Sequence, residues 1–312
     1  MKAFIFDPTW DDLSTPQQLQ DLASAGVELI VTKTIAPLSD CKELFDGDEE
    51  RVLCLNPDYV SWSLKSEDYK DIPNLKAILG AATSFSWVDM AHANTAGIAV
   101  CNQKGFSTQA VAEWAVTMLM NLARQTPRLI KDGFPLDFDK DFFKYRGIEL
   151  HGKKAGIIGL GNIGTAVAQR LKGLGMEVSY WSRTDKLNDY NYTDIKSLII
   201  DSDVVVSTLA LNDETKKLLT DELIKSMKNS AILIGTSHGL FNQQLVLDMV
   251  KNGQLYGFGF EAKPKSFTNY EGNVWAAPEY AWVTDGSMKA STEMFVENML
   301  QAAQGKFPNK VN

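Results

Sequence analysis

Short apolar runs recur along the N-terminal part of the chain and alternate with polar segments of helical length. The apolar runs cover residues 3–6, 27–32, 52–55, 75–79 and 98–101. Polar segments such as 15–25 and 39–50 separate them. Continuous short apolar runs are typical of strands buried in a parallel sheet, and the segments between them are long enough to form the crossovers. The pattern therefore predicts a parallel sheet built from βα units.

A second series of apolar runs starts at Lys154 and repeats this arrangement. Its members are residues 156–159, 178–181, 204–207, 231–235 and 257–260. A chain of 312 residues is long enough for two domains. We therefore expect an α/β protein with two doubly wound parallel-sheet domains, and a periodic segment from Ala290 to Ala303 predicts a C-terminal helix.

The segment from Gln109 to Arg124 predicts a helix with a broad apolar face. The apolar residues at helical spacing are Ala110, Val111, Trp114, Ala115, Met118, Leu119 and Leu122. A face of this width needs a partner, because exposed apolar surface on this scale is unusual in a soluble monomer. The partner is either a core between domains or a second subunit, and the sequence leaves both open.

Three glycines follow the first apolar run of the second series in a Gly-x-Gly-x-x-Gly pattern, at Gly159, Gly161 and Gly164. The order of strand, tight turn, helix and second strand is the context that gives this pattern meaning. Gly159 permits the turn, Gly161 lets the backbone approach a pyrophosphate, and Gly164 lets helix and strand pack closely. The N-terminus of the helix then offers N–H groups to the phosphates. The motif predicts a dinucleotide site; the alternative is a glycine-rich turn in an ordinary βα unit.

The end of the next strand bears on the choice of cofactor. An acidic residue usually stands there and accepts hydrogen bonds from the ribose 2′-OH. Here the residues are Ser182, Arg183 and Thr184, with no carboxylate among them. The guanidinium can pair with a 2′-phosphate and the two hydroxyls can donate to it. We therefore expect NADP(H) to be preferred, with NAD(H) possible; the alternative is that Arg183 is a solvated loop residue.

Composition narrows the partners and the compartment. The formal net charge is −8 and the sequence has no basic stripe, so nucleic acid is not expected as a partner. No apolar run approaches the roughly 18 residues of a membrane span, and the N-terminus lacks the apolar region of a signal peptide. Cys41, Cys54 and Cys101 lack metal-ligand spacing, so we expect reduced thiols and no metal site. These features predict a cytoplasmic protein.

The order and spacing of several stretches resemble the D-isomer-specific 2-hydroxyacid dehydrogenases, in particular the glyoxylate/hydroxypyruvate reductases. The stretches that carry the resemblance are residues 75–78, 97–102, 107–113, 147–164 and 201–211. The resemblance covers nearly the whole chain. It implies a Rossmann NAD(P)-binding domain of residues 99–285, inserted in a flavodoxin-like substrate domain made of residues 1–98 and 286–312. It also implies a homodimer with the helix from Gln109 to Arg124 in its interface.

The resemblance adds further expected cofactor contacts to the glycines and to residues 182–184. These additional residues are Thr108, Asn162, Ile163, Leu209, Thr236 and Ser237. It also places a substrate loop at Ala82, Thr83 and Ser84, where the family has a Gly-x-Gly segment whose N–H groups bind the substrate carboxylate. A residue with a side chain adopts a positive φ less readily than glycine, so this loop departs from the family pattern.

The chain also departs from the family at the catalytic positions. His238 stands where the family has an arginine that binds the substrate, and Gly286 stands where it has the proton-donating histidine. Ser266 falls nearest to the glutamate that orients that histidine. The Arg/Glu/His set of the family is therefore not retained. Glu261 keeps the acidic character of the residue that meets the nicotinamide amide.

His238 and Glu261 remain as the catalytic candidates. An imidazole beside the nicotinamide could donate a proton to a carbonyl oxygen as hydride arrives. The alternative is a histidine at a strand end whose hydrogen bond goes to a backbone carbonyl. Three functional hypotheses follow. The first is an NADP(H)-dependent oxidoreductase that reduces a small carbonyl compound such as a 2-oxo acid, with altered catalytic groups. The second is a catalytically silent NAD(P)-binding sensor or scaffold, and the third is a reductase for a non-acid substrate.

Overall fold

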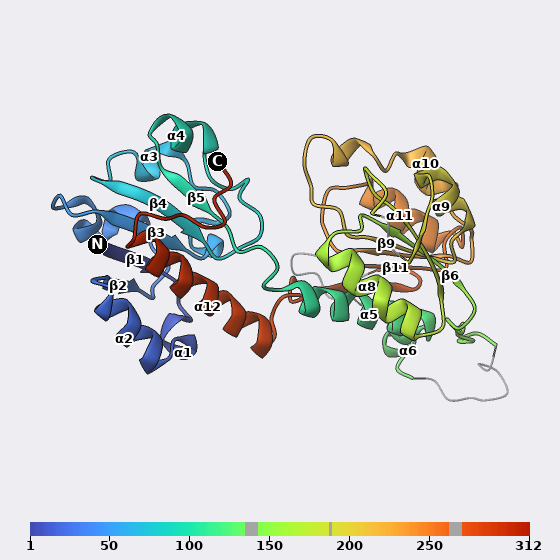
Figure 1. Ribbon diagram of the computed structural model, residues 1–312. Coiled ribbons are helices and arrows are strands. Elements are labelled where there is room, and N and C mark those ends of the chain that lie inside the picture. The colour runs from blue at the N-terminus through green and yellow to red at the C-terminus, as the bar shows by residue number, and fades with distance from the viewer. Residues whose placement is uncertain (135–142, 187–188, 262–269) are drawn as a thin grey trace. The chain divides into compact units, whose positions relative to one another are not determined.

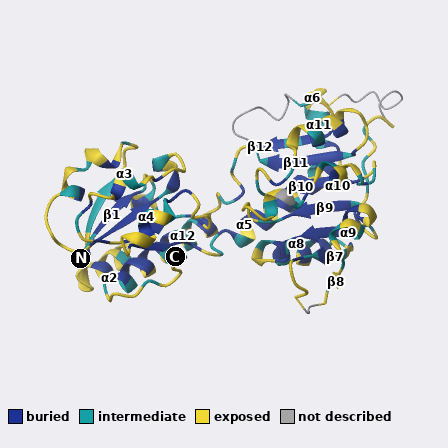
Figure 2. Cartoon of the chain, turned by 90° about the horizontal axis from the view of Figure 1, so that it is seen from above, coloured by how far each residue is buried: buried dark blue, intermediate teal, exposed yellow. Residues whose placement is uncertain are grey.

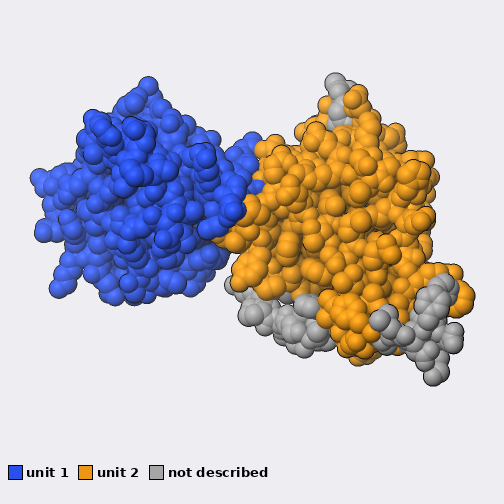
Figure 3. All heavy atoms as spheres, turned by 90° about the horizontal axis from the view of Figure 1, so that it is seen from below, with its two compact units in different colours: residues 1–107, 285–312 blue, residues 108–284 orange. Residues whose placement is uncertain are grey.

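The computed structural model describes residues 1–134, 143–186, 189–261 and 270–312 (Figure 1). Contacts within the chain group it into two compact units, Met1–Ser107 with Asp285–Asn312, and Thr108–Thr284 (Figure 3). The sequence placed these boundaries after residue 98 and after residue 285. Because strand β5 (Ala99–Cys101) pairs with β4 (Leu75–Gly80), the first unit continues beyond residue 98.

The first unit contains a five-stranded parallel sheet with the order β2-β1-β3-β4-β5. The remaining strands are β1 (Lys2–Phe6), β2 (Glu28–Thr32) and β3 (Arg51–Leu55). All five coincide closely with the apolar runs of the first series. This strand order is the flavodoxin-like arrangement. The chain adds β2 on one side of β1 and then β3, β4 and β5 on the other side, so the sheet is doubly wound. The prediction of a doubly wound, flavodoxin-like first domain is confirmed.

Helices cover this sheet and hold its core. They are α1 (Trp10–Leu13), α2 (Pro16–Ser24), α3 (Ser66–Tyr69), α4 (Met90–Thr95) and α12 (Asp285–Ala302), with short 3-10 turns at Leu38–Asp40, Lys42–Phe45 and Pro57–Val60. A capping box between Thr15 and Gln18 fixes the start of α2, with Pro16 at its first position. The predicted C-terminal helix is α12, which packs Phe295 and Met299 into the core under the strands.

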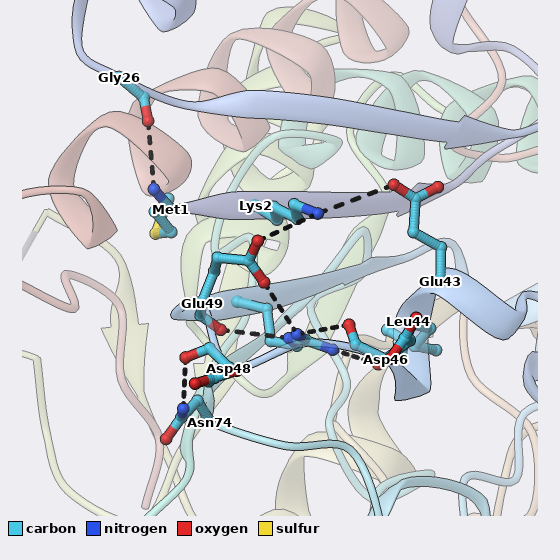
Figure 4. Close-up of polar contacts among 10 residues, drawn as sticks. Met1, Lys2, Gly26, Glu43, Leu44, Asp46, Asp48, Glu49 and Asn74 are labelled. Carbon is cyan, nitrogen blue, oxygen red and sulfur yellow. Dashed lines mark hydrogen bonds and ion pairs between the residues drawn. The ribbon is translucent and has the colours of Figure 1, made fainter.

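A buried arginine anchors the chain that enters β3. Arg51 is fully buried, and its guanidinium donates to the carbonyl oxygens of Leu44, Asp46 and Glu49 at 2.7, 2.9 and 3.2 Å (Figure 4). Glu49 also forms an ion pair with Lys2 at 3.4 Å. A buried charge is tolerated when it is hydrogen-bonded, and here all three guanidinium nitrogens donate. The cluster therefore holds the loop before β3 and is structural.

The second unit contains a seven-stranded parallel sheet with the order β12-β11-β10-β9-β6-β7-β8. Its strands are β6 (Lys154–Ile158), β7 (Glu177–Trp181), β8 (Asn191–Tyr192), β9 (Val204–Ser207), β10 (Ile232–Gly235), β11 (Gly257–Glu261) and β12 (Val274–Ala277). The order runs outward in both directions from β6 and β9, so the topological switch point lies between them. Ligands of open α/β sheets bind beyond the carboxyl ends of the strands at such a point.

Helices cover both faces of this second sheet, and Figure 2 shows the strands β9, β10 and β11 as buried. They are α5 (Thr108–Ala123), α6 (Thr126–Lys131), α8 (Asn162–Gly173), α9 (Ile195–Asp201), α10 (Asp221–Lys225) and α11 (Gln243–Lys251), with a 3-10 turn at Thr215–Lys217. Strands β8 and β12 were not predicted, because β8 has two residues and half of β12 is alanine, which is uncommon in strands. No helix in the described part of the chain is long and apolar enough to cross a membrane.

The broad apolar face of α5 packs mainly against the chain's own sheet. Met118 and Leu122 are buried, together with residues of β6, β9 and β10. The approach to β11 is close, because a Cβ atom at Gly259 would lie 3.1 Å from Leu122 Cδ1 and 3.2 Å from Met118 Cβ. A core within one chain therefore covers most of this face. Met120 stays exposed on the outer side, so dimerisation through α5 stays a prediction.

Candidate functional site

The first glycine of the motif forms a turn that other residues would strain. Gly159 follows β6 directly and has a φ of +97°, in the left-handed region. Its N–H donates to the Trp181 carbonyl oxygen at 2.8 Å, which ties the turn to the end of β7. A Cβ atom there would lie 2.9 Å from Leu209 Cδ2. The backbone conformation therefore favours glycine at this position, and the Leu209 side chain would have to move to admit a Cβ atom.

The third glycine lets helix α8 approach the end of β6. A Cβ atom at Gly164 would lie 2.1 Å from the Gly159 carbonyl oxygen and 2.8 Å from Thr208 Oγ1. The Thr208 hydroxyl donates to the same carbonyl oxygen at 2.6 Å. Sequence analysis missed Thr208 as a support of this turn. Its signal was its place, since it follows β9 immediately at the switch point.

The middle glycine is open to solvent, and this opening fits a dinucleotide. Gly161 caps α8 in an extended conformation, and a Cβ atom there would meet nothing within 4 Å. Next to it, the N–H groups of Asn162 and Ile163 lie in the first turn of α8 and have no acceptor within the helix. Donors at a helix N-terminus attract phosphate, and the absent Cβ leaves room for it. The turn is thus packed at Gly159 and Gly164 and open between them.

The residues at the end of β7 have an acidic neighbour that the sequence did not reveal. Arg183 is 82% exposed, and its Nη1 lies 3.2 Å from a carboxylate oxygen of Glu214. Residues 182–184 contain no carboxylate, as the sequence shows, but the loop after β9 brings the Glu214 carboxylate to this arginine. The buried Ser182 hydroxyl donates to the Thr184 carbonyl oxygen, so it serves the turn itself.

Other predicted cofactor residues lie at neighbouring strand ends. Thr236 follows β10, and both its N–H and its hydroxyl donate to the Ser207 carbonyl oxygen, at 3.2 and 3.0 Å. Leu209 covers Gly159 from the end of β9. Thr108 is the first residue of α5. The carboxyl ends of β6, β9 and β10 thus bring together the glycine turn, Leu209 and Thr236.

A small pocket of about 10 Å³ lies at the carboxyl ends of β10 and β11, and both catalytic candidates line it. Its lining is Gly235, Ser237, His238, Gly239, Leu240, Phe241, Gln243, Phe258, Phe260 and Glu261. Two titratable side chains thus share an otherwise mostly apolar and glycine-rich surface. Titratable groups gathered in a pocket at this edge of the sheet are candidates for acid–base chemistry.

A carboxylate holds the imidazole of His238. Its Nε2 lies 3.1 Å from Oε1 of Glu279, and the two side chains are about half exposed. The partner of this nitrogen is therefore an acidic side chain and not a backbone carbonyl. Glu279 was missed by sequence analysis, because it follows β12, which was itself not predicted. The usable signal was a charged residue just after a short apolar run.

Glu261 is the last residue of β11, and the pKa of its carboxyl group is raised. Burial raises the pKa of Glu261 to about 7, and the nearby Glu279 carboxylate adds to the rise. The hydrogen bond from the Ala281 N–H acts in the other direction and lowers the pKa. The Ala281 N–H donates to Oε1 of Glu261 at 2.8 Å. At neutral pH both forms of the carboxyl group are populated, so it can donate or accept a hydrogen bond or a proton.

The predicted substrate loop lies in the first unit, after β4. Thr83 is held on two sides, since its hydroxyl donates to the Gln103 carbonyl oxygen at 3.0 Å and its carbonyl accepts from Asn102 Nδ2 at 2.7 Å. None of Ala82, Thr83 and Ser84 has a positive φ. The backbone of this loop therefore needs no glycine.

Two further positions, Ser266 and Gly286, stand where the family has catalytic residues that this chain lacks. Ser266 lies outside the described residues. Gly286 lies in the first turn of α12, where a Cβ atom would meet nothing within 4 Å.

Comparison with known proteins identifies the family. The family model of the D-isomer specific 2-hydroxyacid dehydrogenase, NAD binding domain, matches residues 116–281. A glyoxylate reductase of Thermofilum pendens is 29% identical over 280 residues, covering 84% of this chain and 80% of that protein. A glyoxylate reductase of Thermococcus litoralis is 31% identical over 272 residues, covering 81% and 82%.

Solved structures agree over the whole length. The TT0316 protein of Thermus thermophilus has a TM-score of 0.83 and 25% identity, with 100% of both chains covered. An acyclic imino acid reductase (Bsp5), solved with NADPH and D-arginine, also has a TM-score of 0.83, with 22% identity and 100% of both chains covered. The second likeness concerns the fold alone. With an NAD-binding domain matched over residues 116–281, this chain belongs to the D-isomer-specific 2-hydroxyacid dehydrogenase family.

Proposed function

We propose that this protein is an NADP(H)-preferring oxidoreductase that transfers hydride between the nicotinamide and a small carbonyl compound, with 2-oxo acids as the first class. One observation carries the proposal. His238 and Glu261, whose pKa is raised to about 7, line one pocket at the carboxyl edge of the sheet that also bears the glycine turn. A proton donor and a second titratable group thus stand at the edge where this fold class binds cofactors.

The chain's own residues would hold the cofactor as follows. The open backbone at Gly161 and the N–H groups of Asn162 and Ile163 bind the pyrophosphate. Gly159 and Gly164 keep the turn and the helix in place for it. Further along the cofactor, contacts come from Thr108, Thr184, Leu209, Thr236 and Ser237, while Ser182 supports the turn that carries Thr184. When bound, the reduced nicotinamide supplies the hydride.

His238 and Glu261 take the remaining chemical roles. His238 donates the proton that the carbonyl oxygen needs when its carbon accepts hydride. Glu261 faces the carboxamide end of the cofactor and orients it through a hydrogen bond. In this proposal Ala82, Thr83 and Ser84 bind the substrate. The Thr83 hydroxyl already donates to the Gln103 carbonyl oxygen, so the Ser84 hydroxyl and the backbone N–H groups of this segment would make the contact.

Arg183 is the basis of the proposed preference for NADP(H). Its exposed guanidinium can pair with a 2′-phosphate in bidentate fashion. The ion pair with Glu214 is exposed, so it competes only weakly with a phosphate. The imino acid reductase of the same fold, solved with NADPH, supports the proposal that this architecture accommodates the phosphate.

The names of the relatives suggest the first substrate to test. Glyoxylate reductases are among the similar proteins, so glyoxylate heads a panel of 2-oxo acids, aldehydes and ketones. NADPH oxidation is followed by absorbance, with NADH in parallel, and cofactor binding is measured by fluorescence. Turnover of a 2-oxo acid supports the proposal, and turnover of aldehydes or ketones alone favours a non-acid substrate. NADPH binding without any turnover would overturn the proposal in favour of a silent sensor or scaffold.

We also propose that the protein works as a homodimer in the cytoplasm. The outer side of α5, which includes the exposed Met120, would lie in the dimer interface. An exposed methionine on a long helix is suited to such a contact, because its flexible thioether adapts to an apolar partner.

A further inference from the structure

Three acidic or imidazole side chains come from the ends of three adjacent strands. His238 follows β10, Glu261 ends β11, and Glu279 follows β12, and these strands are neighbours in the sheet. Register brings their ends level, since Gly235 pairs with Phe260 and Glu261 pairs with Ala277. Residues far apart in the chain are thereby placed along one edge.

Glu279 contacts His238 directly, and the segment that carries Glu279 also contacts Glu261. Its Oε1 lies 3.1 Å from Nε2 of His238. Two residues further on, the Ala281 N–H holds the carboxyl group of Glu261 at 2.8 Å. The segment after β12 therefore binds both catalytic candidates. Since the pair with His238 is half exposed, its own contribution to stability is small, and its importance lies in geometry.

We propose that Glu279 is a positioning residue, which holds the Nε2–H of His238 and thereby fixes the ring with Nδ1 as the nitrogen that delivers the proton. This inference rests on the proposed function, in which His238 is the proton donor. Imidazole has two distinct nitrogens, and the hydrogen bond made by one of them decides the role of the other. A carboxylate can only accept here, so Nε2 keeps its proton throughout.

The proton step balances with the groups that are present. The imidazolium starts with a proton on each nitrogen, with Nε2–H held by Glu279. Hydride adds to the carbonyl carbon, and the electron pair of the C=O π bond moves to the oxygen. That oxygen takes the proton from Nδ1, whose N–H bonding pair stays on the nitrogen as a lone pair. The ring is left neutral, and because it is half exposed, water can return a proton to Nδ1.

The first test measures the ring itself and needs no turnover. The chain has three histidines, so NMR with ¹³C-labelled histidine gives a small set of ring signals, and His238→Asn assigns one of them. We expect ring-carbon relaxation of His238 in the wild type to match that of a fixed side chain. Glu279→Ala should release the ring, whereas Glu279→Gln should hold it, because the amide oxygen still accepts. Glu271→Gln, in an exposed pair with Lys251, is the matched control and should change nothing.

The second test separates positioning from binding. Misplacing a reacting group by about 1 Å can cost about a hundredfold in rate, so Glu279→Ala should lower kcat tenfold or more. The KM for NADPH should stay unchanged, and Glu279→Gln should recover part of kcat. An unchanged ring signal in Glu279→Ala, or a kcat equal to that of Glu271→Gln, would overturn the inference. A wild type with the expected ring response but no turnover on any substrate would instead overturn the proposed function.

Discussion

Nη1 of Arg183 lies 3.2 Å from a carboxylate oxygen of Glu214, at the end of the strand where the ribose of a dinucleotide is expected. Both side chains are largely exposed, so water screens their attraction. A phosphate can form two parallel, charge-assisted hydrogen bonds with the same guanidinium. Arg183 can therefore exchange one anionic partner for another, and Glu214 opposes rather than prevents phosphate binding.

Replacing Arg183 should change the cofactor preference without abolishing activity. For Arg183→Ala we expect kcat/KM for NADPH to fall about tenfold or more, since hydrogen bonds to charged groups contribute about 1.5–3 kcal/mol. The value for NADH should stay within about twofold, because no 2′-phosphate is involved. Glu214→Gln is the companion variant and should strengthen NADPH binding slightly. An equal loss with both cofactors in Arg183→Ala would contradict the assignment.

The two glycines Gly161 and Gly164 make a matched pair for testing the turn. In Gly164→Ala the new Cβ would lie 2.1 Å from a backbone carbonyl oxygen, so helix α8 must move. We expect a loss of about 1–3 kcal/mol of stability, measured by thermal denaturation. In Gly161→Ala the new Cβ meets open space, so stability should be unchanged while NADPH affinity falls. A Gly161→Ala variant that binds NADPH as tightly as the wild type would argue against the pyrophosphate site.

Stability should depend on pH through Glu261. Its pKa is about 7 in the folded protein against 4.5 for the free group, so between these values the folded state binds more protons than the unfolded state. The free energy of unfolding therefore falls as pH rises through this window and levels off above pH 7. Glu261→Gln removes this loss, and at pH 8 the variant should be more stable than the wild type by about 1–3 kcal/mol, allowing for partial exposure.

Thermal denaturation of the wild type, Glu261→Gln and the control Glu271→Gln at pH 5 and pH 8 checks this prediction. The stabilisation should be present only in Glu261→Gln and only at the higher pH. A Glu261→Gln variant that follows the wild type at both values would show that this carboxyl group titrates normally.

The proposed dimer is tested on the exposed side of α5. Placing a charge at Met120 should break an apolar interface while leaving the fold intact, because this side chain is 41% exposed in the single chain. We expect light scattering to report a dimer for the wild type and a monomer for Met120→Glu. Lys153→Glu changes a residue elsewhere in the same unit and should stay dimeric. A wild-type protein that is monomeric in solution would contradict the proposed dimer.

Local patterns were enough to predict most of the fold. Ten apolar runs correspond to strands. The glycine turn also lies where its spacing placed it, with a positive φ at Gly159. Both features could be predicted because they depend on residues that are close together in the sequence. Strand β12 was missed because two of its four residues are alanine, which is uncommon in strands, so the run does not stand out.

The candidate site was less accessible to sequence reasoning than the fold. His238 and Glu261 were found because the family resemblance placed them after identifiable strands. Their controlling partner Glu279, and the Glu214 partner of Arg183, are brought in by the order of strands in the sheet. Pairing across a sheet depends on this order, which local pattern does not reveal. The raised pKa of Glu261 likewise follows from burial by distant segments.

The central claim is that His238 is a proton donor in a working oxidoreductase, and His238→Asn tests it most directly. Steady-state NADPH oxidation with the best 2-oxo acid of the panel is measured for wild type and variant, together with NADPH affinity by fluorescence. The account predicts that kcat falls about 10²–10⁴-fold, the range supplied by a positioned acid, while NADPH affinity stays the same. Wild-type turnover in His238→Asn would contradict it.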